Sequence, residues 1–343
     1  MPRLALPRLA SPRRLAIPRH TAPPVLLPLH VAACDNFINA FFGDHSTNGL
    51  LNVTGAPAFA SQLYMCMVAQ ALEKKGDIEQ RRAQNQWGTS TWQLNEIWPT
   101  GGWGSLEYGT VGFTPGQVVG GRWKPLHHLL ASHLYRDVIS VCGSAGFCYL
   151  RSDDAGTPFA GSVAVSLLHL RSAQLAPLKA VPVSVPRGGA AFAYFCLGTG
   201  DALAGTCQAV GGVLAAAGCA ADGSDCVLLT NTTAASGEVK DENWALLATP
   251  AALAASGALP RANVSAAVAG APLPDGSVPI AVTSDAPALL VVLTSLAQGR
   301  FEPNFFTLPN AGVATVRFLP FEGFDAQQLL GSLRVEHAAQ YLL

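Results

Sequence analysis

Charged side chains are scarce in this 343-residue chain: Asp, Glu, Lys and Arg make up 13% of the residues, whereas half of the residues are hydrophobic. This composition allows a large core and argues against disorder over most of the length. The formal net charge of −1 argues against a nucleic-acid-binding protein that depends on phosphate contacts. At about 150 residues per domain, the length suggests two or three domains.

The sequence also lacks a convincing membrane-spanning segment. The uncharged run from Ala202 to Ala221 contains four Gly and few large apolar side chains. Such a run is too weakly hydrophobic to drive insertion into a bilayer. We therefore expect no membrane partner.

Acidic residues are missing from the N-terminus, where residues 1–34 carry five Arg and the first carboxylate belongs to Asp35. Proline recurs through Met1–Pro24, so the segment has no continuous apolar core of the kind a signal peptide needs. The Arg content fits a transit peptide, but the prolines disfavour its amphipathic helix. We expect residues 1–30 to be a basic, Pro/Arg-rich leader, either transit-like or an artefact of a misplaced start site.

No cysteine pair has the C-x-x-C spacing of a zinc site, and the histidines do not group with the eight cysteines. Two cysteine groups lie close together in the sequence: Cys142 with Cys148, and Cys207 with Cys219 and Cys226. Both groups are compatible with short disulfide-closed loops, although the connectivity cannot be read from the sequence.

Three N-glycosylation sequons begin at Asn52, Asn231 and Asn263. One sequon is weak evidence, because the pattern arises by chance. Three sequons together with the cysteine groups favour the secretory pathway, a lysosome or vacuole, or the extracellular space.

The first part of the chain has the pattern of an α/β unit. Apolar residues recur at steps of about four between Phe59 and Arg82, which predicts an amphipathic helix. A short β-prone stretch, Thr89 to Trp92, and a glycine-rich loop follow, and a second helical pattern begins after Pro125.

From Asp137 onwards, short apolar runs alternate with turn residues, which predicts an all-β sandwich followed by a second small β domain. The Ala-rich stretch 202–272 is difficult to interpret, and we attribute its alanine content to compositional bias rather than to helices. The predicted strands are Val138–Val141, Phe147–Leu150, Ser162–Leu170, Val181–Val185 and Ala190–Leu197, then Val278–Thr283, Ala288–Leu296 and Ala314–Leu319.

Aromatic residues are concentrated in residues 87–108, which hold four of the six Trp of the chain. Flat aromatic faces stack on sugar rings, and amides and carboxylates bind sugar hydroxyls, so this cluster is a candidate sugar site; packing in an α/β core is the alternative. Glu96 and Glu107 could form the carboxylate pair of a glycosidase. Nothing in their spacing fixes a separation, and we favour structural or surface roles for both.

Other catalytic signatures are missing. The sequence has no G-x-S-x-G, and its Gly-Gly pairs lack the lysine of a phosphate-binding loop. The histidines 127, 128 and 133 lie on or near one predicted helix, without a metal-ligand spacing. We expect them to be solvated or to cap the helix.

A long motif carries a family resemblance. From Trp92 to Gly109 the chain reads Trp-Gln-Leu-Asn-Glu-Ile-Trp-Pro-Thr-Gly-Gly-Trp-Gly-Ser-Leu-Glu-Tyr-Gly. This motif resembles the β-mannosidases, in the glycoside hydrolase group that includes β-galactosidase and β-glucuronidase. Further similar segments occur at Gly121–His127, Ser61–Arg82, Gln298–Asn304 and Leu333–Ala338.

The resemblance implies an α/β plus all-β architecture: the end of a (β/α)8 barrel followed by two immunoglobulin-like β-sandwiches. Residues 31–136 would be the C-terminal part of the barrel, with Thr89–Asn95 as its eighth strand. Residues 137–235 would form the first sandwich, and residues 236–343 the second.

The resemblance also implies a function, the hydrolysis of terminal non-reducing β-D-mannose residues in oligosaccharides and glycoproteins, with retention and without a metal or other cofactor. The family's two catalytic Glu precede the Trp92 motif and are not matched here, so we expect the chain alone to be inactive. By position in the motif, Glu96 is not catalytic. The expected substrate contacts are Trp92, at the end of a barrel strand, and less strongly Asn95 and Trp103.

Two alternatives remain open. The chain could be a non-catalytic sugar-binding or scaffold protein built on the two sandwiches. It could also belong to the same enzyme group but act on another sugar, as a glucosaminidase does. The Trp-rich motif does not separate these sugars.

Overall fold

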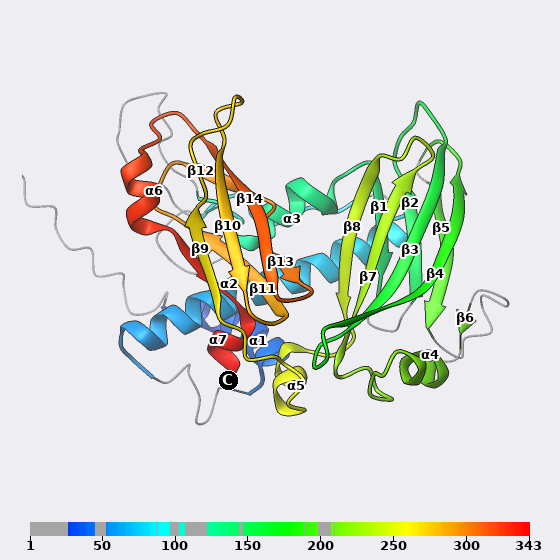
Figure 1. Ribbon diagram of the computed structural model, residues 1–343, viewed down its shortest axis with the longest axis horizontal. Helices are drawn as coiled ribbons and strands as arrows, with labels where there is room; N and C mark the ends of the chain where they lie inside the picture. The colour runs from blue at the N-terminus through cyan, green and yellow to red at the C-terminus, as the bar shows by residue number, and fades with distance from the viewer. Residues whose placement is uncertain are drawn as a thin grey trace, which may run out of the picture.

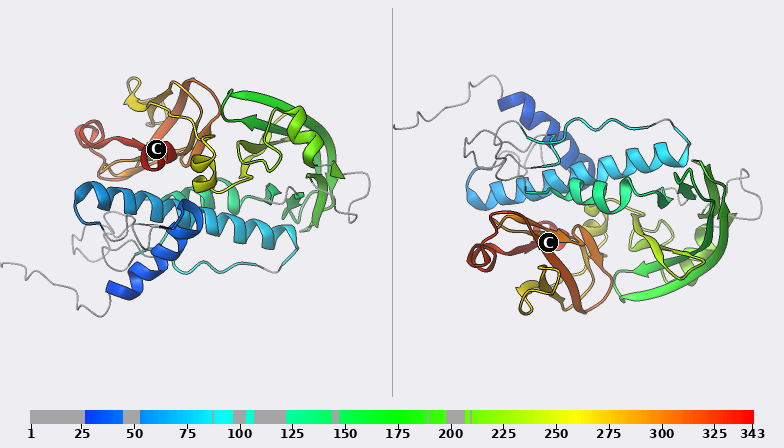
Figure 2. Two further views of the ribbon diagram at one scale, coloured as in Figure 1. Left: turned by 90° about the horizontal axis from the view of Figure 1, so that it is seen from below. Right: turned by 90° about the horizontal axis from the view of Figure 1, so that it is seen from above.

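A layer of helices lies along one side of two β-sandwiches that stand next to each other (Figures 1 and 2). No helix in the described ranges is long and apolar enough to cross a membrane. The computed structural model describes residues 27–44, 53–86, 88–96, 103–106, 122–143, 147–188, 190–197, 207–208 and 210–343.

Helix α2, Ala56–Ala83, is the longest element and confirms the helix predicted from Phe59 to Arg82. It begins with a proline in its first turn and ends with two arginines, whose charge favours a helix C-terminus. Helix α1, Leu27–Phe42, packs against it, and the disulfide Cys34–Cys66 joins the two helices. The second predicted helix is α3, Pro125–Leu129, extended by a π-helical turn, η2, Leu130–Leu134.

The strand expected at Thr89–Asn95 is not formed, and the described residues contain no barrel. Asn95 makes one isolated parallel bridge with Leu106, which makes one antiparallel bridge with Trp123. A β-strand requires a neighbour that continues the hydrogen-bonded ladder. The described residues of the segment 31–136 provide only these single bridges, so the stretch 88–96 is irregular.

The first sandwich consists of two four-stranded sheets, with the orders β1-β2-β5-β6 and β4-β3-β7-β8. All five strands predicted here are present, and the alternation of β3 places Val163, Val165 and Leu167 in the core between the sheets. The strands are β1 Val138–Cys142, β2 Phe147–Ser152, β3 Phe159–His169, β4 Gln174–Val185, β5 Ala190–Leu197, β6 Cys207–Gln208, β7 Cys226–Ala234 and β8 Val239–Leu246.

Two short disulfide-closed loops belong to this sandwich. Cys142 and Cys148 face each other across β1 and β2 and form a disulfide. A second bridge joins Cys219 to Cys226. The loops expected from the cysteine spacing are therefore present.

The boundary expected between residues 235 and 236 divides a hairpin. Strands β7 and β8 pair antiparallel across it, with Asn231 opposite Glu242. The first sandwich therefore extends to Leu246, because the charged sequence of β8 belongs to its sheet.

The second sandwich pairs a sheet of order β12-β14-β10-β9 with a three-stranded sheet of order β13-β11-β15. Its three predicted strands, β10, β11 and β14, are present, and Ile280, Val291 and Val316 meet in its core. The strands are β9 Val264–Val268, β10 Val278–Ser284, β11 Ala288–Thr294, β12 Gly299–Glu302, β13 Phe306–Leu308, β14 Gly312–Pro320 and β15 Arg334–Glu336; helices α6 Ala326–Ser332 and α7 Ala338–Leu342 accompany them.

The Ala-rich stretch is more regular than we expected. It contains two short helices, α4 Val210–Ala216 and α5 Pro250–Ala255. Thr249 caps α5 by accepting a hydrogen bond from the backbone N–H of Ala252. The interpretation of the alanine content as bias alone was therefore wrong.

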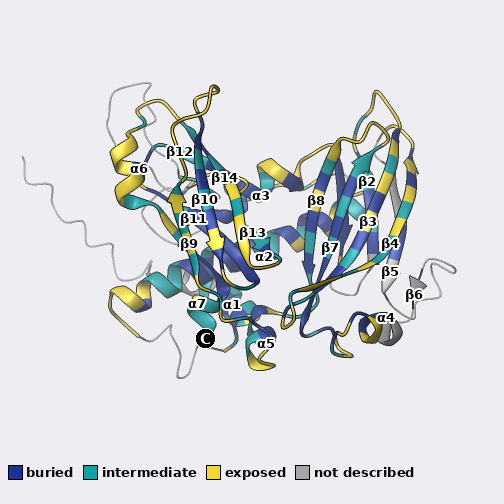
Figure 3. Cartoon of the chain, viewed as in Figure 1, coloured by how far each residue is buried: buried dark blue, intermediate teal, exposed yellow. Residues whose placement is uncertain are grey.

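One apolar core connects all three parts. Tyr64, Val68 and Leu72 of α2 pack in it with side chains from both sandwiches. Figure 3 shows buried residues on the strands that face the helices. The sandwich residues in this core include Leu168, Leu170 and Val227 from the first, and Leu289, Leu290, Val292 and Phe305 from the second.

Candidate functional site

Trp92 projects from the irregular segment 88–96 and is 75% exposed. Asn95 is exposed on the same segment, and its side-chain Nδ2 donates to the carbonyl of Glu96 at 2.8 Å. An exposed indole and an exposed amide on one segment have the chemistry to stack on a sugar ring and to hydrogen-bond its hydroxyls.

Trp103 is half-buried on the adjoining segment 103–106. Gln70 of α2 donates from Nε2 to the Trp103 carbonyl at 2.7 Å, which fixes this segment on the helix layer. The backbone N–H of Glu96 donates to Leu106 at 3.0 Å, so the two segments lie side by side. The three predicted residues thus lie on two adjoining segments, and their contact with a sugar stays a prediction.

Gly104 allows the close approach of these segments. A Cβ added at Gly104 would lie 2.3 Å from the backbone nitrogen of Glu96 and 2.4 Å from the carbonyl carbon of Asn95. Both contacts would be with backbone atoms, which, unlike a flexible side chain, cannot rotate away. Only glycine fits here, because any other side chain would separate the segment of Trp103 from that of Asn95.

Glu96 forms a buried ion pair with Lys124, the residue before α3. The exposed fractions are 2% for Glu96 and 4% for Lys124, so each charge depends on the other for compensation. The backbone N–H of Lys124 also donates to the carbonyl of Ser105 at 3.0 Å. These contacts support the structural role expected for Glu96, whereas Glu107 lies outside the described residues.

The histidines of α3 and η2 contradict the expectation that they are solvated. His128 and His133 are both buried. Asn304 of the second sandwich donates from Nδ2 to Nε2 of His128 at 3.0 Å, and burial, with His127 and Arg300 nearby, lowers the pKa of His128 to about 3. His127 is half-buried, with Nδ1 2.9 Å from the hydroxyl of Ser105.

A cleft of about 540 Å³ lies between α2 and the second sandwich. Trp123 is in its wall, but the guanidinium of Arg300 lies over the indole, 4.8 Å from the ring centroid. That face of Trp123 is therefore closed to a sugar. The predicted residues Trp92, Asn95 and Trp103 do not line this cleft.

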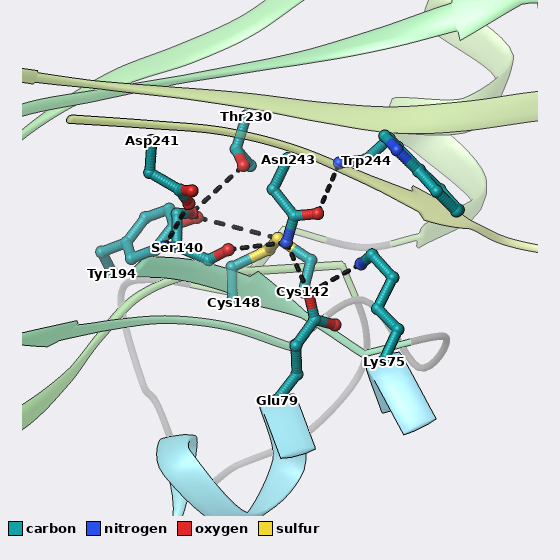
Figure 4. The surroundings of a disulfide bond; sticks show 10 residues. All are labelled: Lys75, Glu79, Ser140, Cys142, Cys148, Tyr194, Thr230, Asp241, Asn243 and Trp244. Atoms are coloured by element: carbon teal, nitrogen blue, oxygen red, sulfur yellow. Dashed lines mark hydrogen bonds and ion pairs between the residues drawn. A yellow bond between two sulfur atoms is a disulfide. The ribbon is translucent and has the colours of Figure 1, made fainter. Parts of the chain in front are cut away.

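A buried polar network joins α2 to strands β1 and β8 of the first sandwich, beside the Cys142–Cys148 disulfide (Figure 4). Glu79 is its centre: Oε1 accepts from Lys75 at 2.7 Å, from Asn243 of β8 at 2.8 Å and from His133 at 2.7 Å. Three donors on one carboxylate oxygen compensate for its loss of water.

The network continues into the sandwich through Asp241. Its Oδ1 accepts from Nδ1 of His133 at 2.7 Å, and its Oδ2 accepts from the backbone N–H of Ser140 at 2.7 Å. Asn243 donates to the carbonyl of Ser140 at 2.7 Å. Lys75 lies over the ring of Trp244, 4.8 Å from its centroid, which is a cation–π contact.

The charges of this network compensate one another. Burial works to lower the pKa of His133, but Asp241 and then Glu79 raise it to about 9. Burial works to raise the pKa of Glu79, but Lys75 and His133 outweigh it and lower that pKa. At neutral pH the Glu79 carboxylate therefore faces a protonated His133.

Sequence reasoning missed this network. Lys75 and Glu79 lie in the charged second half of the predicted helix, a pattern that does not distinguish buried from exposed charges. The i, i+4 spacing of the pair was visible, but nothing in the sequence indicated that Asp241 and Asn243 lie against it.

One group of potential metal ligands occurs in the described ranges: Cys219, Asp225 and Cys226. The two sulfur atoms are bonded to each other as a disulfide. They are not thiolates, which metal coordination requires, so this group does not form a metal site.

The comparisons with known proteins agree with one another. Residues 259–341 match the Ig_mannosidase family, described as an Ig-fold domain. Beta-mannosidase A of Aspergillus niger is 29% identical over 171 residues, which are 44% of this chain and 17% of that protein. Beta-mannosidase of Bos taurus is 34% identical over 92 residues, 24% of this chain and 9% of that protein. The chain thus spans less than a fifth of either relative.

Solved structures share the fold over most of the chain. The β-D-mannosidase of Dictyoglomus thermophilum superposes with a TM-score of 0.60 and 18% identity, covering 89% of this chain and 32% of that one. The exo-chitosanase CsxA of Amycolatopsis orientalis gives a TM-score of 0.55 with 12% identity, covering 89% of this chain and 35% of that one.

Proposed function

We propose that this chain, which resembles the C-terminal portion of the β-mannosidases, takes part in the hydrolysis of terminal non-reducing β-D-mannose residues, with retention. The relatives named above are β-mannosidases, and the Ig_mannosidase match falls on the second sandwich. The single observation that carries the proposal is the Trp92 motif, in which an exposed indole lies on the same segment as Glu96, whose carboxylate forms a buried ion pair with Lys124.

In this proposal, residues 31–136 correspond to the end of a (β/α)8 barrel and the sandwiches support it. Helix α2 packs against η2 and the strands of the first sandwich, which would fix the barrel end in place. The superposition over 89% of the chain on a β-D-mannosidase supports this correspondence of folds.

Trp92 is the proposed platform for the mannose ring, and Asn95 and Trp103 are proposed to contribute hydrogen bonding and shape. Glu96 is a positioning residue, because its carboxylate is buried against Lys124 rather than aimed at a substrate. The family's two catalytic carboxylates precede the Trp92 motif and have no counterpart among these 343 residues. The proposed role is therefore one wall of a sugar site, without hydrolysis by the chain alone.

We also propose that the protein folds in an oxidising compartment of the secretory pathway. Three disulfides, Cys34–Cys66, Cys142–Cys148 and Cys219–Cys226, support this placement. Disulfides are rare in reducing compartments.

The test is titration of the full chain with β-1,4-mannobiose, followed by tryptophan fluorescence and calorimetry. Stacking on Trp92 should change the emission of an exposed indole. The variant Trp92→Ala should lose binding, because stacking of the Trp92 indole on a face of the sugar ring is the main contact proposed. Leu94→Ala is the matched control, since Leu94 is 60% exposed on the same segment and has no proposed sugar contact.

Three outcomes decide the proposal. Saturable binding that Trp92→Ala removes and Leu94→Ala keeps supports it. Equal binding by both variants would place the sugar elsewhere, as in a sandwich-based lectin. Hydrolysis of p-nitrophenyl β-D-mannoside by the chain alone would contradict the proposed inactivity.

The size of the native protein provides a second test. An antibody against residues 137–343 is applied to an extract of the cells that make the protein. The protein that it detects is sized and assayed for β-mannosidase activity. Activity recovered with a product much heavier than 35.6 kDa supports the enzyme proposal. A single inactive band near 35.6 kDa favours the non-catalytic alternative.

A further inference from the structure

The sequons at Asn231 and Asn263 lie in different surroundings, whereas Asn52 is outside the described residues. Asn231 is half-buried in β7, an interior strand paired on both sides. Its Nδ2 donates to Glu242 at 3.0 Å, and its Oδ1 accepts from Thr233 at 3.1 Å. Both ends of this amide are engaged on the face of the sheet, in the middle of neighbouring strands.

Asn263 lies directly before β9, at the end of a sheet. The side chains of Asn263 and Ser265 are both exposed, and they point to the same side because they are two residues apart in extended chain. Asp285 accepts from the backbone N–H of Asn263 at 2.7 Å and from its Nδ2 at 2.6 Å. Nδ2 carries two hydrogens, so one can be donated to Asp285 while the other is replaced by a glycan.

Among the described strands, β9 is hydrogen-bonded to β10 alone; β15 of the other sheet lies near β9 but forms no hydrogen-bonded ladder with it. The sequence of β9, Val-Ser-Ala-Ala-Val, contains no charge and no proline. The strand at the opposite end of this sheet, β12, carries Arg300 and Glu302. An edge strand with unpaired backbone groups can pair with another chain. Proteins prevent this with charged side chains or proline on the edge strand, or with another group that covers it. On this sheet β12 has charge and β9 does not.

We propose that Asn263 carries an N-linked glycan that covers the outer edge of β9. Nδ2 of Asn263 attacks C1 of a lipid-pyrophosphate-linked oligosaccharide: the N–C1 bond forms, the C1–O bond breaks, Nδ2 loses one proton, and the lipid pyrophosphate leaves with the electron pair. The three disulfides support folding in the compartment where this transfer occurs. The proposal rests on that secretory route and is independent of mannoside hydrolysis.

The test uses the full chain, directed by a cleavable signal peptide into the secretory pathway of eukaryotic cells. Glycopeptide mass spectrometry reads the occupancy of each sequon, and size-exclusion chromatography reads self-association. Ser265→Ala removes the sequon but leaves Asn263 and its bonds to Asp285 intact. It should lose one glycan and elute partly as larger species, as should wild-type protein after enzymatic deglycosylation.

Thr233→Ala is the matched control, because it removes the sequon of Asn231 in the interior strand; it should leave elution unchanged. The proposal is overturned if Asn263 is unmodified in secreted, disulfide-bonded protein. It is also overturned if Ser265→Ala loses its glycan and remains as monomeric as the wild type. Thermal unfolding of Ser265→Ala within a few degrees of wild type shows that any self-association comes from the uncovered edge and not from misfolding.

Discussion

His133 donates its Nδ1 hydrogen to the carboxylate of Asp241 at 2.7 Å, joining the turn after α3 to strand β8. The other ring nitrogen lies 2.7 Å from Glu79. An imidazole between two carboxylates holds both hydrogens, so it is a cation at neutral pH. The contact between helices and sandwich is thus ionic at its centre and apolar around it.

The first prediction concerns alkaline pH. The folded-state pKa of His133 is raised to about 9 from 6.5. Its contribution to stability is therefore complete below pH about 6.5 and is lost as the pH rises through about 9, a change of a few kcal/mol. Urea unfolding between pH 6 and 10 should show this fall.

His133→Gln is the comparison for that experiment. It lacks a titrating ring, so it should be less stable at pH 6 and show a flatter pH profile. A wild-type profile no steeper than that of the variant would contradict a charged His133 in the folded protein.

The second prediction concerns Glu79. Glu79→Gln removes the negative charge that compensates Lys75 and His133, which stay buried. Breaking a buried pair in this way costs about 3–5 kcal/mol. The free energy of unfolding at pH 7 should fall by that order.

Asp77→Asn on the same helix is the control. Asp77 pairs with Arg81 at 2.8 Å, and both side chains are more than a third exposed. An exposed i, i+4 pair contributes about 0.3–0.5 kcal/mol, so this variant should be close to wild type. Equal losses of unfolding free energy from both substitutions would show that the buried network stabilises the protein no more than the exposed pair does.

The third prediction concerns Gly104. Gly104→Ala places a methyl group 2.3 Å from the backbone nitrogen of Glu96, so the segment must move. We expect reduced thermal stability together with weaker binding of mannobiose. Gly76→Ala, in α2 with no atom within 4 Å of the new Cβ, should raise stability by up to about 1 kcal/mol. A Gly104→Ala variant that binds like wild type would separate this loop from the sugar site.

The fourth prediction concerns the contact of α2 with the second sandwich. The hydroxyl of Tyr64, fully buried, donates to the carbonyl of Leu290 at 2.8 Å. Tyr64→Phe leaves that carbonyl without this donor and should cost about 1–3 kcal/mol. Tyr135→Phe, at an exposed tyrosine, should stay within about 0.5 kcal/mol in the same denaturation assay. A neutral Tyr64→Phe would show that packing alone holds this interface.

The periodicity of the sequence predicted the buried positions of a strand correctly where those positions are apolar. In β3 the apolar alternation and the burial coincide at Val163, Val165 and Leu167. It failed in β8, where the buried positions include Asp241 and Asn243. Their partners come from helices more than 100 residues away in the sequence, so no local window contains the reason for their burial.

The candidate site shows the same limit. The aromatic cluster at residues 87–108 indicated a candidate sugar site, and the family resemblance singled out Trp92 within it; the structure finds the Trp92 indole exposed. The strand expected around it depended on neighbouring strands, which local sequence does not provide. The pairing of Glu96 with Lys124 spans 28 residues, and neither residue type predicts the other.

The single core shared by the helices and both sandwiches has a consequence for how the molecule comes apart. Leu168 of the first sandwich and Leu289 of the second belong to the same apolar core as Tyr64 of α2. Neither sandwich can detach without exposing apolar surface on the other two parts. Heat or denaturant should therefore melt the three parts in one cooperative transition, and a protease cut between α5 and β9 should leave both halves associated.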